Sequence, residues 1–219
     1  MPNTLENMQN DDLEIDNLPN RLTLFRVLLI PVVITLLLIA DSGSDLLGFN
    51  ASTLGWIAAW IFVIASITDF FDGYIARKRG IVTVFGSFLD PIADKFLTVS
   101  CLIMLQSLDR VYAVVVIVLV LREMYMTSLR LLAMNEGISV PVNQMGKWKT
   151  ALQMMGIPML MANETWLMIP FPLVGTSLIY ISAVLSLWSA IHYSYNMILK
   201  LKEKRKKSKL EKKQSKLNK

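Results

Sequence analysis

Four aspartates within one apolar stretch are the residues best placed to do chemistry: Asp69, Asp72, Asp90 and Asp94. A carboxylate deep in a bilayer costs about a few kcal/mol or more, so an acid inside an apolar segment suggests a functional site. If both flanking segments are helices, the first two acids are three residues apart and the second two are four apart, so each pair lies on one helix face. A short turn over residues 77–83 would bring the two pairs opposite each other.

Four converging carboxylates repel one another and take up protons unless cations neutralise them. Hard divalent cations prefer oxygen ligands, and four acids can hold two such ions. Gly73, Ala76 and Gly86 leave room among the acids for a bulky ligand or a partner helix. In the alternative interpretation the acids are helix-end charges paired with the basic residues 77–79. That pairing accounts for one or two acids but not for four, because buried charges are rare unless they are paired or metal-bound.

Two divalent cations held by acids could promote displacement at phosphorus. The cations would neutralise a pyrophosphate leaving group, and a free carboxylate could take the proton of an attacking hydroxyl. The residues alone therefore predict phosphoryl transfer at a membrane surface.

Composition indicates the class of protein around these acids. The 219 residues are 54% hydrophobic, with a mean hydropathy of +0.49, which is too apolar for a soluble domain of this size. Six apolar segments are each close to the ~20 residues that a helix needs to cross about 30 Å of hydrocarbon. They are residues 22–40, 54–76, 83–106, 111–134, 148–167 and 172–198. The sequence predicts an all-α integral membrane protein with six transmembrane helices.

Charge is separated along the chain. Residues 1–17 contain five acids and no basic residue, whereas residues 200–219 contain eleven Lys or Arg and two Glu, a net of +9 in a chain of net +5. We therefore predict an acidic, disordered segment 1–17, a six-helix domain 18–199 and a basic cytoplasmic tail 200–219. Such a tail also resembles a nucleic-acid patch. Next to a spanning helix a role toward anionic lipid or solvent is favoured, and we expect no nucleic-acid partner.

The loops predict the orientation. Residues 77–79, Lys147, Lys149 and the basic tail fall on one side, and the alternate loops hold one basic residue, Arg110. The positive-inside rule then puts both termini and the turn between the aspartate pairs in the cytoplasm.

A cation or proton pathway is the remote alternative to phosphoryl transfer. Transporters usually show internal repeats and a midplane site, whereas this chain shows no repeat and its acids crowd one side.

Further basic residues on the same side suggest a second anion site. Arg122 and Arg130 interrupt an apolar segment, and Lys147 opens the next one. Guanidinium and ammonium groups there could hold a second phosphate near the metals. The alternative, an ion pair between Arg122 and Glu123, is weakened because adjacent residues point to different faces of a helix. For Arg26, about a turn inside the first segment, a functional role and snorkelling to the headgroups are equally good interpretations.

Eight positions also reproduce a family signature, DxxDGxxAR, eight residues, then GxxxDxxxD. They are Asp69, Asp72, Gly73, Ala76, Arg77, Gly86, Asp90 and Asp94. The sequence thereby resembles the CDP-alcohol phosphatidyltransferases. The resemblance implies a six-helix membrane enzyme, usually a homodimer, that moves a phosphatidyl group from CDP-diacylglycerol to an alcohol and releases CMP.

The resemblance also implies a role for each position. Asp69, Asp72 and Asp90 would bind two divalent cations, normally Mg²⁺ or Mn²⁺, and Asp94 would contact metal and act as the general base. The CDP-diacylglycerol pocket would be formed by Asn20, Thr23, Gly73, Ala76, Arg77 and Gly86.

Weaker likenesses point to one branch of this family. Residues 17–26 (NLPNRLTLFR), 122–130 (REMYMTSLR) and 144–150 (QMGKWKT) resemble the bacterial phosphatidylglycerophosphate synthases. Their acceptor is glycerol 3-phosphate. The resemblance also implies that the protein lies in the bacterial cytoplasmic membrane with its active site facing the cytoplasm. The acceptor phosphate would be bound by Arg122, Arg130 and Lys147. Phosphatidylglycerol, as in cardiolipin synthesis, serine and an inositol phosphate remain alternative acceptors.

Overall fold

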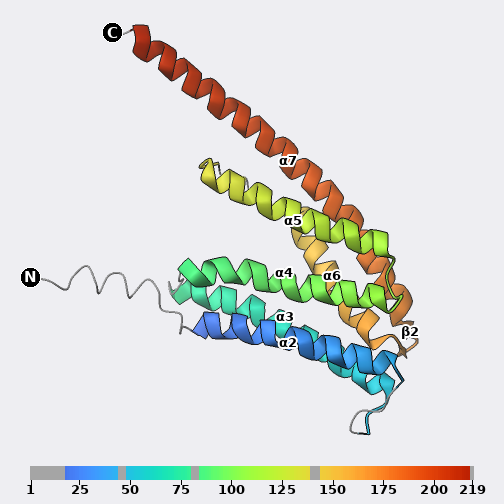
Figure 1. Cartoon of the computed structure of the whole chain (residues 1–219). Coiled ribbons are helices and arrows are strands. Elements are labelled where there is room, and N and C mark those ends of the chain that lie inside the picture. Colours follow the sequence, from blue (N-terminus) through green and yellow to red (C-terminus); the bar gives the residue numbers. More distant parts are fainter. Residues whose placement is uncertain (1–17, 44–47, 80–83, 139–143, 218–219) are drawn as a thin grey trace, which may run out of the picture.

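A computed structural model describes residues 18–43, 48–79, 84–138 and 144–217 (Figure 1). Within these ranges, the side chains of residues 18–23, 69–79, 84–94, 207–213 and 215–217 are not described. The predicted acidic segment 1–17 lies outside the described residues.

Six long α-helices and one short hairpin make up the described chain. The elements are α2 (Leu18–Asp41), α3 (Ala51–Arg79), α4 (Val84–Ser107), α5 (Ala113–Asn135), α6 (Gln144–Ala162), β1 (Thr165–Trp166), β2 (Ile169–Pro170) and α7 (Phe171–Leu217). The all-α prediction is confirmed apart from this hairpin.

The helices pack as a bundle in which successive helices alternate in direction. The helix α2 contacts both α3 and α4, α3 contacts α6, and α7 contacts α5 and α6. Figure 1 shows that α3 ends and α4 begins at the same end of the bundle, beside the start of α2. This arrangement brings the two helix segments that carry the signature to one end of the protein.

One continuous core joins all six helices. Cys101 is fully buried there, as its apolar setting predicts. Other members include Leu37, Phe62, Leu105, Leu119, Leu160 and Ile179. Large apolar side chains also cover the outside, among them Leu28, Ile64, Ile117 and Leu187. An outer surface of this kind suits lipid rather than water.

Membrane character is supported by length and composition. In the described part of the chain, three helices contain stretches long and apolar enough to cross a bilayer: Leu24–Asp41, Ala51–Thr68 and Phe171–Lys206. Lys95–Ser107 is a shorter apolar helix. The charged residues Arg122, Glu123 and Arg130 make α5 less apolar. Six membrane crossings therefore stay a prediction.

The predicted end of the fifth helix was wrong. The fifth apolar segment was expected to stay helical to residue 167, but α6 ends at Ala162 and Asn163 adopts φ 52°. Asparagine tolerates this left-handed conformation, which stops a helix. The antiparallel hairpin that follows pairs Trp166 with Ile169 through a turn in which Leu167 and Met168 both have positive φ. Positive φ at both central residues matches the twist of a two-residue hairpin turn.

The last helix also extends further than predicted. The sixth apolar segment was predicted to end at residue 198, whereas α7 continues to Leu217. No Gly or Pro interrupts residues 200–217, and most of them are Lys, Leu, Glu or Arg, which are good helix formers. The basic residues up to 217 therefore continue the helix that contains the apolar stretch Phe171–Lys206.

Close backbone approaches hold α6 in place. A Cβ atom at Gly55 of α3 would lie 2.7 Å from the Met161 carbonyl oxygen, and one at Gly156 of α6 would lie 3.1 Å from the Gly175 carbonyl oxygen of α7. Arg110 Nη1 donates to the Leu160 and Met161 carbonyls at 2.8 and 2.9 Å. Burial lowers the pKa of Arg110, and the negative charge of Asp41 opposes that shift. Arg110, the one basic residue that the sequence places in the alternate loops, thus caps the end of α6.

Candidate functional site

The signature residues lie on two consecutive helices. Asp69, Asp72, Gly73, Ala76 and Arg77 fall in the last part of α3. Gly86, Asp90 and Asp94 fall in the first half of α4. Both segments are helical, so the spacings of three and four residues place each aspartate pair on one face of its helix. The side chains themselves, like those of Asn20 and Thr23 in α2, lie outside the described ones, and their predicted convergence stays a prediction.

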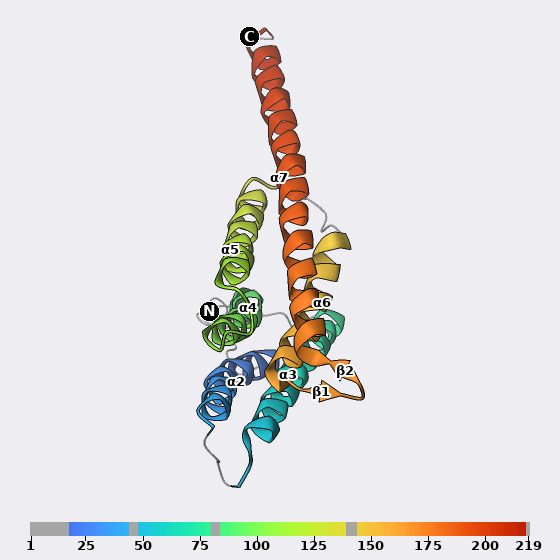
Figure 2. The same cartoon turned by 90° about the vertical axis from the view of Figure 1, so that its right-hand side faces the viewer.

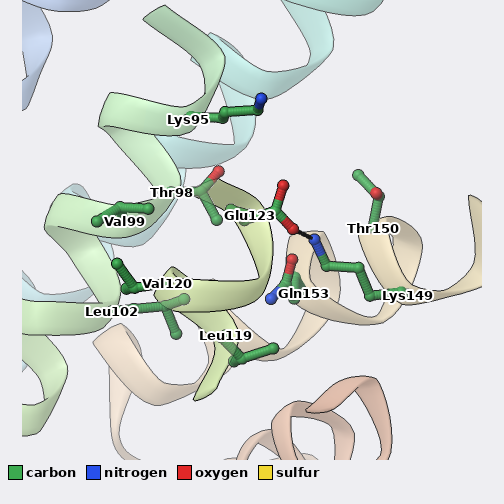
Figure 3. A pocket seen from close by; sticks show the side chains of 10 residues that line it. All are labelled: Lys95, Thr98, Val99, Leu102, Leu119, Val120, Glu123, Lys149, Thr150 and Gln153. Carbon is green, nitrogen blue, oxygen red and sulfur yellow. Dashed lines mark hydrogen bonds and ion pairs between the residues drawn. The ribbon is translucent and has the colours of Figure 1, made fainter. Parts of the chain in front are cut away.

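A polar pocket begins at the residue after Asp94. Polar side chains from three helices face it: Lys95 and Thr98 of α4, Glu123 of α5, and Lys149, Thr150 and Gln153 of α6 (Figure 3). Apolar residues close its other walls, namely Val99, Leu102, Leu119 and Val120. The enclosed space is about 50 Å³, which is room for one or two water molecules or a small polar group.

Glu123 is the centre of this pocket. Its Oε1 accepts hydrogen bonds from Arg122 Nη1 at 3.0 Å and from the Lys149 ammonium group. Arg122 and Lys149 are 7% and 4% exposed. Arg122 also donates Nε to the Ser186 carbonyl at 3.1 Å and Nη2 to Ser189 Oγ at 3.3 Å, both in α7. Glu123 thus links α5 to α6, and Arg122 links α5 to α7.

A third cation reaches the pocket from α4. The Lys95 ammonium group donates to Thr127 Oγ1 of α5, and this hydroxyl donates to the Glu123 carbonyl at 2.8 Å. Arg122 and Lys149 therefore contact the Glu123 carboxylate directly, whereas Lys95 reaches the backbone of Glu123 through the Thr127 hydroxyl. The described lining of the pocket carries two lysines and one glutamate, and this net positive charge suits an anionic group.

The predicted anion residues are placed unevenly. Arg122 is buried in the network, whereas Arg130 and Lys147 are exposed. The argument against an Arg122–Glu123 pair was wrong, because the long arginine side chain bends around its own helix to reach the neighbouring carboxylate. Arg26 is 3% exposed, so protein covers it. That burial contradicts snorkelling to the headgroups.

Lys149 was not among the three predicted phosphate ligands, yet it lines the pocket. Two residues turn a helix by about 200°, so Lys149 faces inward where Lys147 faces outward. The signal was the stripe Lys149, Gln153, Gly156 and Leu160, which follows helical spacing and is buried throughout. Lys95 and Thr127 carried no comparable signal, because their contact depends on how α4 packs against α5.

Comparison with known proteins identifies the family. A family model described as CDP-alcohol phosphatidyltransferase matches residues 16–188. A Rickettsia typhi protein is 41% identical over 180 residues, which cover 82% of this chain and 94% of that protein. A Bacillus subtilis protein is 40% identical over 180 residues, covering 81% of this chain and 89% of its own length. Both are named CDP-diacylglycerol–glycerol-3-phosphate 3-phosphatidyltransferase.

A plant protein extends the similarity. An Arabidopsis thaliana protein named CDP-diacylglycerol–glycerol-3-phosphate 3-phosphatidyltransferase 2 is 35% identical over 194 residues, covering 82% of this chain and 79% of its own length. The chain belongs to the CDP-alcohol phosphatidyltransferase family, as the signature indicated. It is thus a membrane-embedded phosphatidyltransferase.

Removing the central carboxylate should destabilise the protein strongly. Glu123→Gln removes a counter-charge from the buried Arg122 and Lys149, and breaking such a buried pair costs about 3–5 kcal/mol. Glu136→Gln is the matched control. Its pair with Lys204, at 3.0 Å, is exposed and contributes at most about 1 kcal/mol. Thermal unfolding in detergent measures both variants, and equal midpoints would show that the Glu123 network does not hold the helices together.

Proposed function

We propose that the protein transfers the phosphatidyl group of CDP-diacylglycerol to glycerol 3-phosphate and releases CMP, a step of phosphatidylglycerol synthesis. The observation that carries this proposal is the unbroken signature on α3 and α4, next to an electropositive pocket. The names of relatives about 40% identical over most of the chain support the same reaction and the same acceptor.

Asp69, Asp72, Asp90 and Asp94 are proposed to hold two divalent cations, Mg²⁺ or Mn²⁺. Four carboxylates on two adjoining helix ends are an oxygen-only donor set, which fits hard cations. When bound, such ions supply charge neutralisation for the phosphates that separate. Gly73, Ala76, Arg77 and Gly86, with Asn20 and Thr23 of α2, would form the pocket for the nucleotide part of CDP-diacylglycerol.

Asp94 is proposed as the general base. Its carboxylate takes the proton of the primary hydroxyl of the acceptor, and the hydroxyl oxygen attacks the phosphorus on the lipid side of the pyrophosphate. The bond between this phosphorus and the bridging oxygen breaks, and CMP leaves. Rigid helices rather than loops carry the carboxylates, so the reacting groups need little reorganisation.

The phosphate of glycerol 3-phosphate would lie on the basic side of the site. Arg122, Arg130 and Lys147 were the predicted ligands. The pocket adds Lys149 and Lys95, whose ammonium groups converge on Glu123 and Thr127. We propose that Lys149 contacts the phosphate, while Arg122 chiefly holds Glu123 and α7. A second anion site suits this acceptor better than serine, which carries no phosphate.

The topology is part of the proposal. Helices α2 to α7 would each cross the bacterial cytoplasmic membrane, with both termini and the connection between α3 and α4 in the cytoplasm. The alternation of helix direction and the basic residues near the ends of α3, α6 and α7 support this orientation. The division into residues 1–17, 18–199 and 200–219, and a homodimer, are proposed with it.

Acceptor choice tests the reaction. Purified protein in detergent, given CDP-diacylglycerol and Mg²⁺, should release CMP with glycerol 3-phosphate but not with serine, an inositol phosphate or phosphatidylglycerol. Chelation by EDTA should stop the release, and added Mg²⁺ or Mn²⁺ should restore it. Release with another acceptor would keep the aspartate chemistry and reject the acceptor assignment. Ion flux through vesicles without CMP release would favour the transport alternative.

Asp94→Asn should abolish turnover, because an amide cannot accept the proton, yet leave binding of CDP-diacylglycerol measurable. General-base catalysis contributes about 10²–10⁴-fold, and loss of a metal contact would add to the decrease. Asp109→Asn is the control, since Asp109 is exposed in the turn after α4 with φ 56°, which asparagine accepts. Turnover near that of the control would reject the base assignment.

Substitutions of Lys149 and Lys147 distinguish the observed pocket from the predicted phosphate site. Lys149→Gln should raise the KM for glycerol 3-phosphate while the KM for CDP-diacylglycerol changes little. Lost charge-assisted hydrogen bonds of this kind cost about 1.5–3 kcal/mol, roughly 10- to 150-fold. Lys147→Gln, on the exposed side of the same helix turn, should have a much smaller effect. The reverse order would return the acceptor site to Lys147.

A further inference from the structure

The last helix continues beyond the bundle as a basic arm, defined here as residues 200–217 of the 47-residue α7. At 1.5 Å per residue, α7 is about 70 Å long, more than twice the ~30 Å of a bilayer core. The helix runs obliquely to α2, α3 and α4, and its C-terminal part projects past every other helix (Figures 1 and 2). The family match ends at residue 188, so the arm lies beyond the segment shared with the family.

The composition of the basic arm suits a charged partner rather than an apolar one. It contains ten Lys or Arg and two Glu, a net charge of +8, while the whole chain is only +5. Residues 202–206, at the start of the arm, are all exposed. The only large apolar residues are Leu201, Leu210 and Leu217. A helix that is polar on nearly all sides has no stripe to bury against another helix.

The start of the basic arm is fixed to the bundle. Lys204 donates to Glu136 Oε2 at 3.0 Å and to the Glu136 carbonyl, just after the end of α5. Leu201 packs beside the small apolar cluster that contains Met126, Tyr193 and Met197. Figure 1 shows that α5 ends at the same end of the bundle at which α4 begins. The arm therefore emerges on the side of the protein that carries the signature.

We propose that the basic arm binds the anionic phospholipid headgroups of the membrane face on which it emerges. Each Lys or Arg close to an anionic surface raises the association about fivefold, and the attraction extends over a Debye length of about 8 Å in physiological salt. The oblique course keeps successive turns closer to the membrane plane than a perpendicular helix would. Because the arm continues a helix of the bundle, it is held next to the membrane. The headgroups are therefore present at a high effective concentration, which a soluble polyanion lacks. This inference does not depend on the proposed reaction.

Energy transfer to the membrane surface tests the proposal. A fluorophore is attached to Gln214→Cys, an exposed position of the arm, in a Cys101→Ala background. The protein is reconstituted in vesicles of phosphatidylcholine alone, or of equal parts phosphatidylcholine and phosphatidylglycerol, with an acceptor dye on a headgroup. Transfer should be higher in the anionic vesicles. It should fall to the neutral value at about 1 M salt, where the Debye length is about 3 Å.

Charge variants in one turn provide matched controls. Lys202→Gln, Arg205→Gln and Lys206→Gln together should weaken the surface association on the order of a hundredfold, because three positive charges are lost. Glu203→Gln, in the same exposed turn, should strengthen it. Unchanged thermal midpoints would show that all variants fold.

Three results would overturn the proposal. Transfer could be equal in neutral and anionic vesicles, or both sets of variants could reduce it alike. RNA could also displace the labelled arm from anionic vesicles, at RNA concentrations that do not alter the vesicles themselves. That result would assign the arm to nucleic acid.

Discussion

The buried cluster of Glu123, Arg122 and Lys149 is the interaction that ties α5 to both α6 and α7. An ion taken out of water costs several kcal/mol, so two cations this deeply buried need a counter-charge and further acceptors. Ser186 and Ser189 supply further acceptors to Arg122 from α7. The network therefore fixes how each of the three helices is rotated about its axis. It also holds the ammonium group of Lys149 at the pocket before any ligand arrives, which is the preorganisation that electrostatic catalysis requires.

Close packing of α6 against its neighbours explains how the network of Arg122, Glu123 and Lys149 keeps its geometry in a membrane. Lipid tails are as apolar as leucine, so helices in a membrane associate through close van der Waals contact at small residues rather than by escaping water. Gly156 and Gly175 allow α6 and α7 to approach at their backbones. Arg110 caps the far end of α6. The helix that carries Lys149 is thus fixed by an ion pair near its start, a backbone contact in its middle and a cap at its end.

Local patterns in the sequence predicted most of this molecule. Apolar runs of suitable length predicted six helices, and the order of all six and the approximate bounds of the first four agree with the structure. The hairpin at residues 165–170 was missed because its backbone depends on positive φ at Leu167 and Met168, which neither residue type favours. In the site, spacing identified the signature. The prediction chose Lys147 over Lys149 because that choice depends on the rotation of α6, which is visible in the sequence only through the stripe of Lys149, Gln153, Gly156 and Leu160.

The position of the signature along its helices suits a reaction between a lipid and water-soluble molecules. Asp72 lies seven residues before the end of α3 at Arg79, and Asp90 lies six residues after the start of α4 at Val84. These intervals correspond to about 10 Å of helix. A bilayer is about 40–45 Å thick with its headgroups and about 30 Å without them, so each headgroup layer occupies about 5–8 Å. If the helix ends reach the outer edge of that layer, the carboxylates lie just below it. A lipid phosphate can reach them from the membrane, and a nucleotide or a sugar phosphate can reach them from water.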